Sequence, residues 1–135
     1  MLNRNSAIKE NYKIGKYPFE DKIEILFSEN HNLVIQQIVA WPDEISNVEK
    51  LFSDELGVKQ NIDFNRGEIF KINSLWRMEP SKWWLIGRTI ELPENIGTSL
   101  ELSHAFTSIM INGEKSENVP KKHLPLDLRL DNFPI

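Results

Sequence analysis

The pattern of apolar residues in the first half of the chain changes from strand-like to helix-like at Pro42. Before it, residues 33–41 are mostly apolar and predict a buried strand, and residues 22–27 predict a shorter strand upstream. After it, apolar residues recur at spacings of three and four, at Ile45, Val48, Phe52 and Leu56. This spacing predicts an amphipathic helix, in which Asp43 caps the first amides and Gly57 ends the helix.

The middle of the chain predicts a β-hairpin that is rich in tryptophan. Gly67 opens a strand that reaches Trp76 or Met78, and residues 79–82 then turn the chain. The proline in this turn presets the backbone dihedral and donates no hydrogen bond to a sheet. Residues 83–87 are the expected return strand.

The last third of the chain predicts one more strand between two short helices. Residues 92–100 contain a proline and a glycine, and are therefore expected to form only a short helix. Residues 102–111 predict the last strand. A second helix is expected to follow Gly113 and to extend through residues 119–123, with an irregularity at Pro120.

Together these elements predict an α+β fold. After one leading strand, the expected order is strand, helix, strand, strand, helix, strand and helix. This is the split, βαββαβ-type arrangement, in which an antiparallel sheet carries helices on one face. A small half-open barrel would use the same number of strands and is the alternative architecture.

The length and the polar start of the chain define the expected domain organisation. With 135 residues and 15.8 kDa, the chain is expected to form a single domain over residues 20–135. Residues 1–19 are polar, with four cations against one anion, and predict a tail. This tail is either a mobile terminus or an arm that orders along a partner subunit.

Composition and charge exclude several functional classes. A net charge of −4 and a pI near 5.4 argue against nucleic-acid binding, which needs clustered cations. The absence of cysteine excludes disulfides and thiolate metal sites and is typical of a reducing compartment. No apolar run approaches the roughly 20 residues of a membrane span. We therefore expect a soluble, cytoplasmic protein that binds neither nucleic acid nor membrane.

The adjacent tryptophans in the predicted hairpin indicate a sheet with two apolar faces. Neighbouring side chains on a strand point to opposite faces, so Trp83 and Leu85 are expected on one face and Trp84 and Ile86 on the other. A sheet with helices on one side needs only one apolar face. The second face therefore predicts another layer, a folded-back tail or a second polypeptide, and it makes Trp76, Trp83 and Trp84 candidate subunit-interface residues.

The polar residues form no recognisable catalytic or metal-binding set. His104 lies on an apolar face of a predicted strand, which is more typical of a hydrogen-bonded core residue than of a base, and Ser103 points to the opposite face. His31 and His123 show no metal-ligand spacing with it. Asp127 lies in an apolar run and is expected to cap local amides. The scattered glycines form no phosphate-binding loop, so no cofactor is expected on this chain.

Five motifs follow one another in a characteristic order in the second half of the chain. Residues 75–87, LWRMEPSKWWLIG, combine an apolar residue and Trp, a short turn with Pro, and Trp followed by aliphatic residues. A serine-containing strand start and a strand-to-glycine turn come next, then Pro-Leu-Asp-Leu and Phe-Pro. In this order the motifs resemble the gamma subunit of heterotetrameric sarcosine oxidase, from about residue 20 to the end. Apart from the tryptophans, the motif residues are Pro80, Ser103, His104, Gly113 and Asp127.

The resemblance implies a fold and a role. The family is similar in fold to the folate-binding domain of the glycine cleavage T-protein. Its members are accessory subunits of an enzyme that oxidatively demethylates sarcosine, and the larger subunits carry the flavins, NAD and tetrahydrofolate. The family continues past the position of Ile135, so this chain is expected to be short at its C-terminus. A sheet edge or apolar face would then need cover from elsewhere.

Three functional hypotheses follow. The first is a non-catalytic gamma-type subunit that holds larger flavoprotein subunits of a complex acting on sarcosine or a related N-methyl amine. The second is a stand-alone module for folate binding or aminomethyl transfer, in which Asp127 or another acid holds a pterin-like ring. The third is a homo-oligomer that covers its exposed face by self-association.

Overall fold

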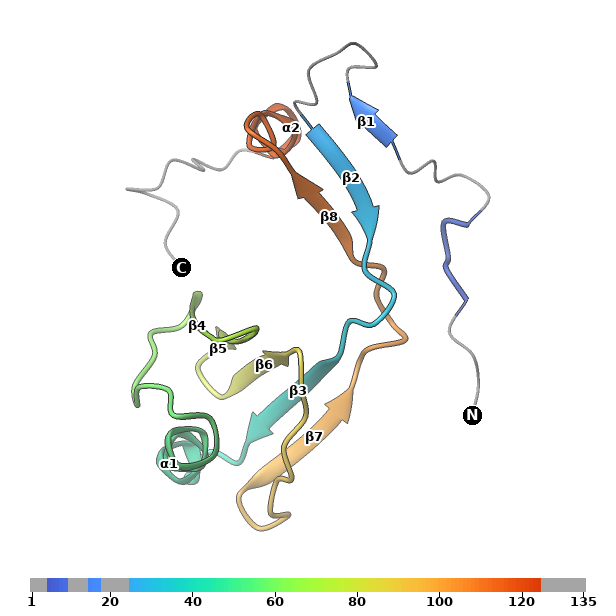
Figure 1. Ribbon diagram of the computed structural model, residues 1–135. Helices are drawn as coiled ribbons and strands as arrows, with labels where there is room; N and C mark the ends of the chain where they lie inside the picture. Colours follow the sequence, from blue (N-terminus) through green and yellow to red (C-terminus); the bar gives the residue numbers. More distant parts are fainter. Residues whose placement is uncertain (1–4, 10–14, 18–24, 125–135) are drawn as a thin grey trace. The chain divides into compact units, whose positions relative to one another are not determined.

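The structure is a computed structural model, and it describes residues 5–9, 15–17 and 25–124. These residues form an α+β fold whose strands pair in antiparallel fashion. They divide into two compact units (Figure 1). One unit spans residues 33–105, and the other contains the described residues before 33 and after 105. The prediction of an α+β fold with antiparallel sheets is therefore confirmed.

The larger unit is a five-stranded sheet with one helix. The strand order across the sheet is β4-β5-β6-β3-β7 (Figure 1). The helix, α1 (Ile45–Leu56), follows β3 in the chain. The strands are β3 (Ile35–Ala40), β4 (Arg66–Phe70), β5 (Asn73–Glu79), β6 (Lys82–Ile86) and β7 (Gly97–Glu101). The predicted strand over residues 33–41, the helix and the return strand after residue 82 are confirmed.

The core of this unit lies between α1 and one face of the sheet. Val48 and Phe52 of α1 are buried against Leu75, Trp83 and Leu85 of the two central hairpin strands. The rings of Phe52 and Trp83 meet edge to face, with centroids 5.4 Å apart. The alternation along β6 therefore has the predicted phase, since Trp83 and Leu85 are buried and Trp84 and Ile86 are only partly covered.

The ends of α1 differ in how well the sequence predicts them. Gly57 adopts φ 71° and its N–H donates to the carbonyl of Ser53, which is the left-handed ending that favours glycine. The helix begins after Glu44, and no side chain caps its first amides. The expectation that Asp43 caps the helix is therefore wrong. The Glu44 N–H instead donates to the carbonyl of Trp41, so a turn leads into the helix.

The strand predicted from Gly67 to Trp76 or Met78 is in fact a hairpin. β4 and β5 pair with each other, and the two-residue turn between Phe70 and Asn73 consists of Lys71 and Ile72. Lys71 has a positive φ of 57°, and this position of a hairpin turn is usually occupied by glycine, asparagine or aspartate. The turn therefore lacks the glycine, asparagine or aspartate from which a hairpin can be predicted in a sequence.

The predicted short helix over residues 92–100 is wrong, because this segment contains strand β7. Two contacts hold this part of the chain against β3. The buried Gln36 side chain donates to the carbonyl of Ile90 and accepts from its N–H, both at 2.9 Å. A Cβ atom on Gly97 would lie 2.4 Å from the carbonyl oxygen of Val39, so glycine lets β7 approach β3 closely.

The smaller unit contains a three-stranded sheet in the order β1-β2-β8 and the helix α2. β1 (Gly15–Tyr17) comes from the predicted tail and pairs with β2 (Ile25–Glu29). β8 (Ile109–Asn112) occupies only the end of the strand predicted over residues 102–111, so that prediction is wrong for its first part. α2 (Asn118–His123) confirms the predicted helix after Gly113, which has φ 122°.

The order of elements differs from the predicted split βαβ arrangement. Among the described residues no helix lies between β6 and β7, so the βαββαβ order is wrong. The helix expected there would have covered the sheet from the same side as α1. The single domain over residues 20–135 stays a prediction.

Trp76 lies across a glycine of the neighbouring strand. Gly67 and Trp76 are opposite each other, and a Cβ atom on Gly67 would lie 2.5 Å from Cε3 of the indole. An aromatic ring placed over a glycine in this way replaces the packing that the missing side chain would supply.

Alanine at Gly67 should therefore displace the indole of Trp76. We expect Gly67→Ala to lower the free energy of unfolding by about 1–3 kcal/mol, the usual cost of overpacking. Urea unfolding measures this loss. In a Trp76→Leu background the same alanine should cost clearly less, because the clashing ring is gone. Equal losses in both backgrounds would contradict the assigned contact.

Candidate functional site

The three tryptophans expected at an interface lie on two different faces of the sheet. Trp83 is only 1% exposed and belongs to the core under α1, so it is not available to a partner while the unit is folded. Trp76 and Trp84 lie on the opposite face and are partly exposed. They are direct neighbours on adjacent strands. The candidate surface is therefore built on these two residues.

Trp76 and Trp84 belong to a row of residues that crosses all five strands of this sheet. The pairing registers place each member opposite the next, in the order Gly67, Trp76, Trp84, Gln37 and Leu100. Leu100 is 58% exposed, and Ile69, two residues from Gly67 on the same face of β4, is 56% exposed. We call this surface the distal face, defined by Ile69, Trp76, Trp84, Gln37 and Leu100.

Hydrogen bonds fix the two indoles on the distal face. The Nε1–H of Trp84 donates to Oε1 of Gln37 at 3.3 Å, and the Nε1–H of Trp76 donates to Oγ of Ser74 at 2.8 Å. Each indole therefore has its polar atom satisfied by a residue of the sheet, and its hydrocarbon surface forms part of the face. A rigid aromatic surface of this kind loses little conformational entropy on binding, which suits a protein interface.

An arginine on the core side supports the strands that carry the two indoles. Nη1 of Arg77 lies 2.8 Å from Oε1 of Glu49 on α1 and donates to the carbonyl of Ile62, also at 2.8 Å. The guanidinium also donates to the carbonyl of Pro80 in the β5–β6 turn and lies 5.1 Å from the centroid of the Trp83 ring. Arg77 therefore links α1, the turn and the core indole.

Sequence reasoning missed this role of Arg77, although a signal was present. Arg77 follows Leu75 at a spacing of two and therefore shares its buried face. A cation on the core face of a strand needs a carboxylate partner, and Glu49 lies on the buried side of α1.

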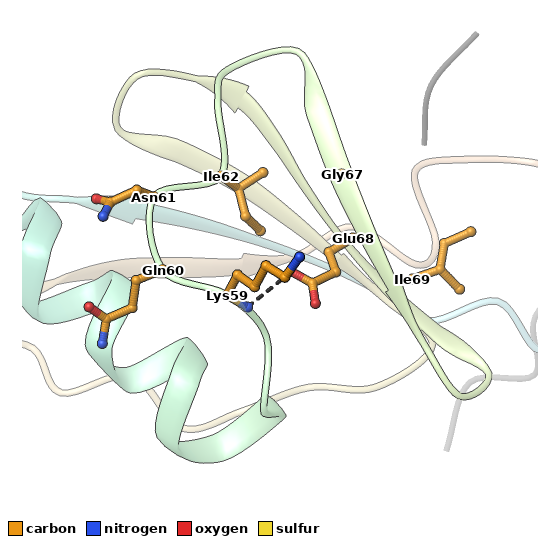
Figure 2. A pocket seen from close by; sticks show the side chains of 7 residues that line it. All are labelled: Lys59, Gln60, Asn61, Ile62, Gly67, Glu68 and Ile69. Carbon is orange, nitrogen blue, oxygen red and sulfur yellow. Dashed lines mark hydrogen bonds between the residues drawn. The ribbon is translucent and has the colours of Figure 1, made fainter. Parts of the chain in front are cut away.

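A pocket of about 570 Å³ lies beside β4, at one edge of the five-stranded sheet (Figure 2). The loop before β4 forms one side, and Gly67, Glu68 and Ile69 of the strand form the other. The backbone N–H of Lys59 donates to Oε2 of Glu68 at 3.0 Å, which holds the loop against the strand. The loop residues are Lys59, Gln60, Asn61 and Ile62. Their amides and one ammonium group suit a polar contact rather than acid–base chemistry.

The motif residues of the sequence analysis are not brought together. Pro80 forms the β5–β6 turn as predicted, and Gly113 follows β8. Ser103 is buried, and its Oγ accepts the N–H of Ile35 at 3.0 Å. His104 is exposed in a turn closed by a hydrogen bond from Ala105 N–H to the carbonyl of Leu102. The expectation that His104 is a core residue of a strand is therefore wrong.

Other candidate chemistry is sparse in the described part of the chain. Asp127 lies outside the described residues. His31 Nδ1 lies 3.6 Å from Oε1 of the nearly buried Glu29 carboxylate, whose Oε2 accepts a hydrogen bond from Ser6 at 2.6 Å. Within residues 5–9, 15–17 and 25–124, no cluster of three histidine, aspartate or glutamate side chains could hold a metal ion. The helices described in this structure include none that is long and apolar enough to cross a membrane.

Comparison with known proteins identifies no relative. A scan of protein-family models, a search of curated proteins and a search of solved structures each returned no match to this chain.

Proposed function

We propose that this chain is a non-catalytic accessory subunit, of the gamma type found in sarcosine oxidase. Its partners are larger flavoprotein subunits of a complex that oxidatively demethylates sarcosine or a related N-methyl amine. The flavins, NAD and tetrahydrofolate belong to those partners, and this chain binds none of them. Its fold is proposed to be of the kind found in the folate-binding domain of the glycine cleavage T-protein.

The observation that carries this proposal is the distal face. Trp76 and Trp84 lie side by side on the side of the sheet opposite α1, flanked by the exposed aliphatic residues Ile69 and Leu100. Burial of apolar surface stabilises a complex by about 25 cal/mol for each Å² that is removed from water. Aromatic residues with exposed aliphatic neighbours are characteristic of the centres of protein interfaces. The resemblance over residues 75–87, which contain both indoles, supplies the identity of the partner.

A lysine placed on the distal face should weaken binding of the flavoprotein partner. We expect Ile69→Lys to reduce the amount of flavoprotein that co-purifies with the tagged chain about tenfold, the effect of losing roughly 1.4 kcal/mol at an interface. The measurement is the flavin absorbance of the complex purified from the protein's own cell extract. Ile69 is exposed, so the substitution should leave the stability of the sheet nearly unchanged.

The matched control is a second isoleucine on the same hairpin. Ile72 is 94% exposed at the tip of the β4–β5 turn and is not part of the distal face. Ile72→Lys should therefore retain the partner. If the wild-type chain captures no flavoprotein, the proposed function is wrong. If instead tetrahydrofolate quenches the tryptophan fluorescence of the purified chain, a folate-binding module would be favoured.

A further inference from the structure

The two edges of the five-stranded sheet are unequally protected. β4 forms one edge and β7 the other (Figure 1). β4 carries the charged residues Arg66 and Glu68, and the loop before it is held against the strand through Lys59 and Glu68. β7 carries a single charge at its end, Glu101, and contains neither lysine nor proline. Proteins normally protect edge strands with such charges, prolines or covering loops.

The hydrogen-bonding pattern shows which backbone groups of β7 point away from the sheet. Trp41 N–H donates to Ile96, and Leu102 N–H donates to Ile35, on either side of the paired region. Hydrogen-bonded pairs alternate along an antiparallel ladder. Residues 98 and 100 therefore bond to β3, while the N–H and C=O groups of residues 97, 99 and 101 point outward.

These outward groups are self-complementary about Ser99. In an antiparallel pair with a two-fold axis at Ser99, each Ser99 bonds to Ser99 of the other copy, and Gly97 bonds to Glu101 of that copy. This register keeps the two Glu101 carboxylates apart. It also places Thr98 opposite Leu100 of the other copy, on the distal-face side, so that it covers part of a leucine that is 58% exposed.

We propose that β7 is a self-association edge, through which two copies of this chain join their sheets in an antiparallel, two-fold arrangement. We assign a second copy of the chain as the partner because β7 can form an isologous contact, in which the same surface of both copies meets across a two-fold axis. The outward N–H and C=O groups of β7 in one copy can pair with the same set of groups in the other copy. The exposed residues of β7 carry only one charge, and the two Glu101 carboxylates do not lie opposite each other. This inference rests on the backbone groups of the edge strand and not on the proposed function, although the pairing also covers part of Leu100 on the distal face.

A cysteine scan of β7 tests both the pairing and its register. The chain contains no cysteine, so a single introduced thiol reports one position. Opposed residues of a hydrogen-bonded pair have Cα atoms about 5.5 Å apart, within the range of a disulfide. We therefore expect Ser99→Cys to give mainly covalent dimer on mild oxidation. The matched control, Glu101→Cys, should give almost none, because the two thiols would be separated by about 13 Å along the strands.

A proline at the same position should abolish association without breaking the sheet. The N–H of Ser99 points outward, so Ser99→Pro removes a donor that β3 does not use. By sedimentation velocity, we expect the wild-type chain and Ser99→Ala to be dimers and Ser99→Pro to be a monomer, with the same circular dichroism. A wild-type chain that stays monomeric at about 1 mM, the level of very weak binding, would overturn the inference. So would equal cross-linking at positions 99 and 101, which would also decide the matter if the proline variant unfolds.

Discussion

Replacing Trp83 with alanine should lower the free energy of unfolding of the 33–105 unit by about 3–5 kcal/mol, the usual cost of removing a buried aromatic side chain. Trp83 is 1% exposed and is the largest fully buried side chain of the described core. Its ring packs edge to face with Phe52, and the ring centroid lies 5.1 Å from Cζ of Arg77. The substitution therefore removes the ring against which Phe52 of α1 packs at the centre of the sheet. Urea unfolding followed by circular dichroism measures the loss.

The neighbouring tryptophan provides the control for this prediction. Trp84 is adjacent in sequence, but it lies on the distal face and is only partly covered. Trp84→Ala should therefore cost clearly less stability than Trp83→Ala, while reducing flavoprotein capture in the co-purification assay. If the two substitutions cost the same stability, both indoles would be core residues, and the distal face would lose its assigned role.

The sequence predictions that are confirmed rest on a regular spacing of apolar residues within one helix or strand. The spacing of Val48 and Phe52 predicts α1, and the two-residue alternation in β6 predicts which indole is buried. Both patterns depend only on neighbours in the chain, because one face of each element is buried and the other is not. The α+β class follows from them.

The failures arise where contacts distant in sequence decide the structure. Nothing within residues 92–100 indicates that Gln36 holds Ile90 or that Gly97 packs against the backbone of β3. Lys71 likewise adopts a positive φ that its residue type does not favour, because β4 and β5 pair on either side of it. Long-range pairing overrides local preference in each case.

The candidate site was only partly predictable for the same reason. The alternation along β6 indicates that Trp84 lies on a second face, but the row from Gly67 to Leu100 depends on four registers between strands. The order of strands in the sheet cannot be deduced from the spacing of residues within each strand. The role of Ser103 was also missed, because its partner, the N–H of Ile35, is 68 residues away.

Replacing Arg77 with methionine should destabilise the same unit by about 3–5 kcal/mol, because it leaves the carboxylate of Glu49 buried without its cation. The Glu49 side chain is only 9% exposed and that of Arg77 15% exposed. The substitution also removes the donors to the carbonyls of Ile62 and Pro80, so part of the loss is expected to loosen the β5–β6 turn. Urea unfolding measures the total.

Two controls separate the stability lost by leaving the Glu49 carboxylate unpaired from the stability lost with the packing of Arg77. One is a double substitution, and the other is an exposed ion pair. In Arg77→Met combined with Glu49→Leu, neither charge of this pair remains, and the double variant should be more stable than Arg77→Met alone. The exposed pair of Lys82 and Glu79 lies on the same hairpin, and Lys82→Met should cost at most about 1 kcal/mol. Equal losses for Arg77→Met and Lys82→Met would show that the buried pair contributes no more than a surface pair. The strands that carry Trp76 and Trp84 would then owe their positions to the apolar core under α1 rather than to Arg77.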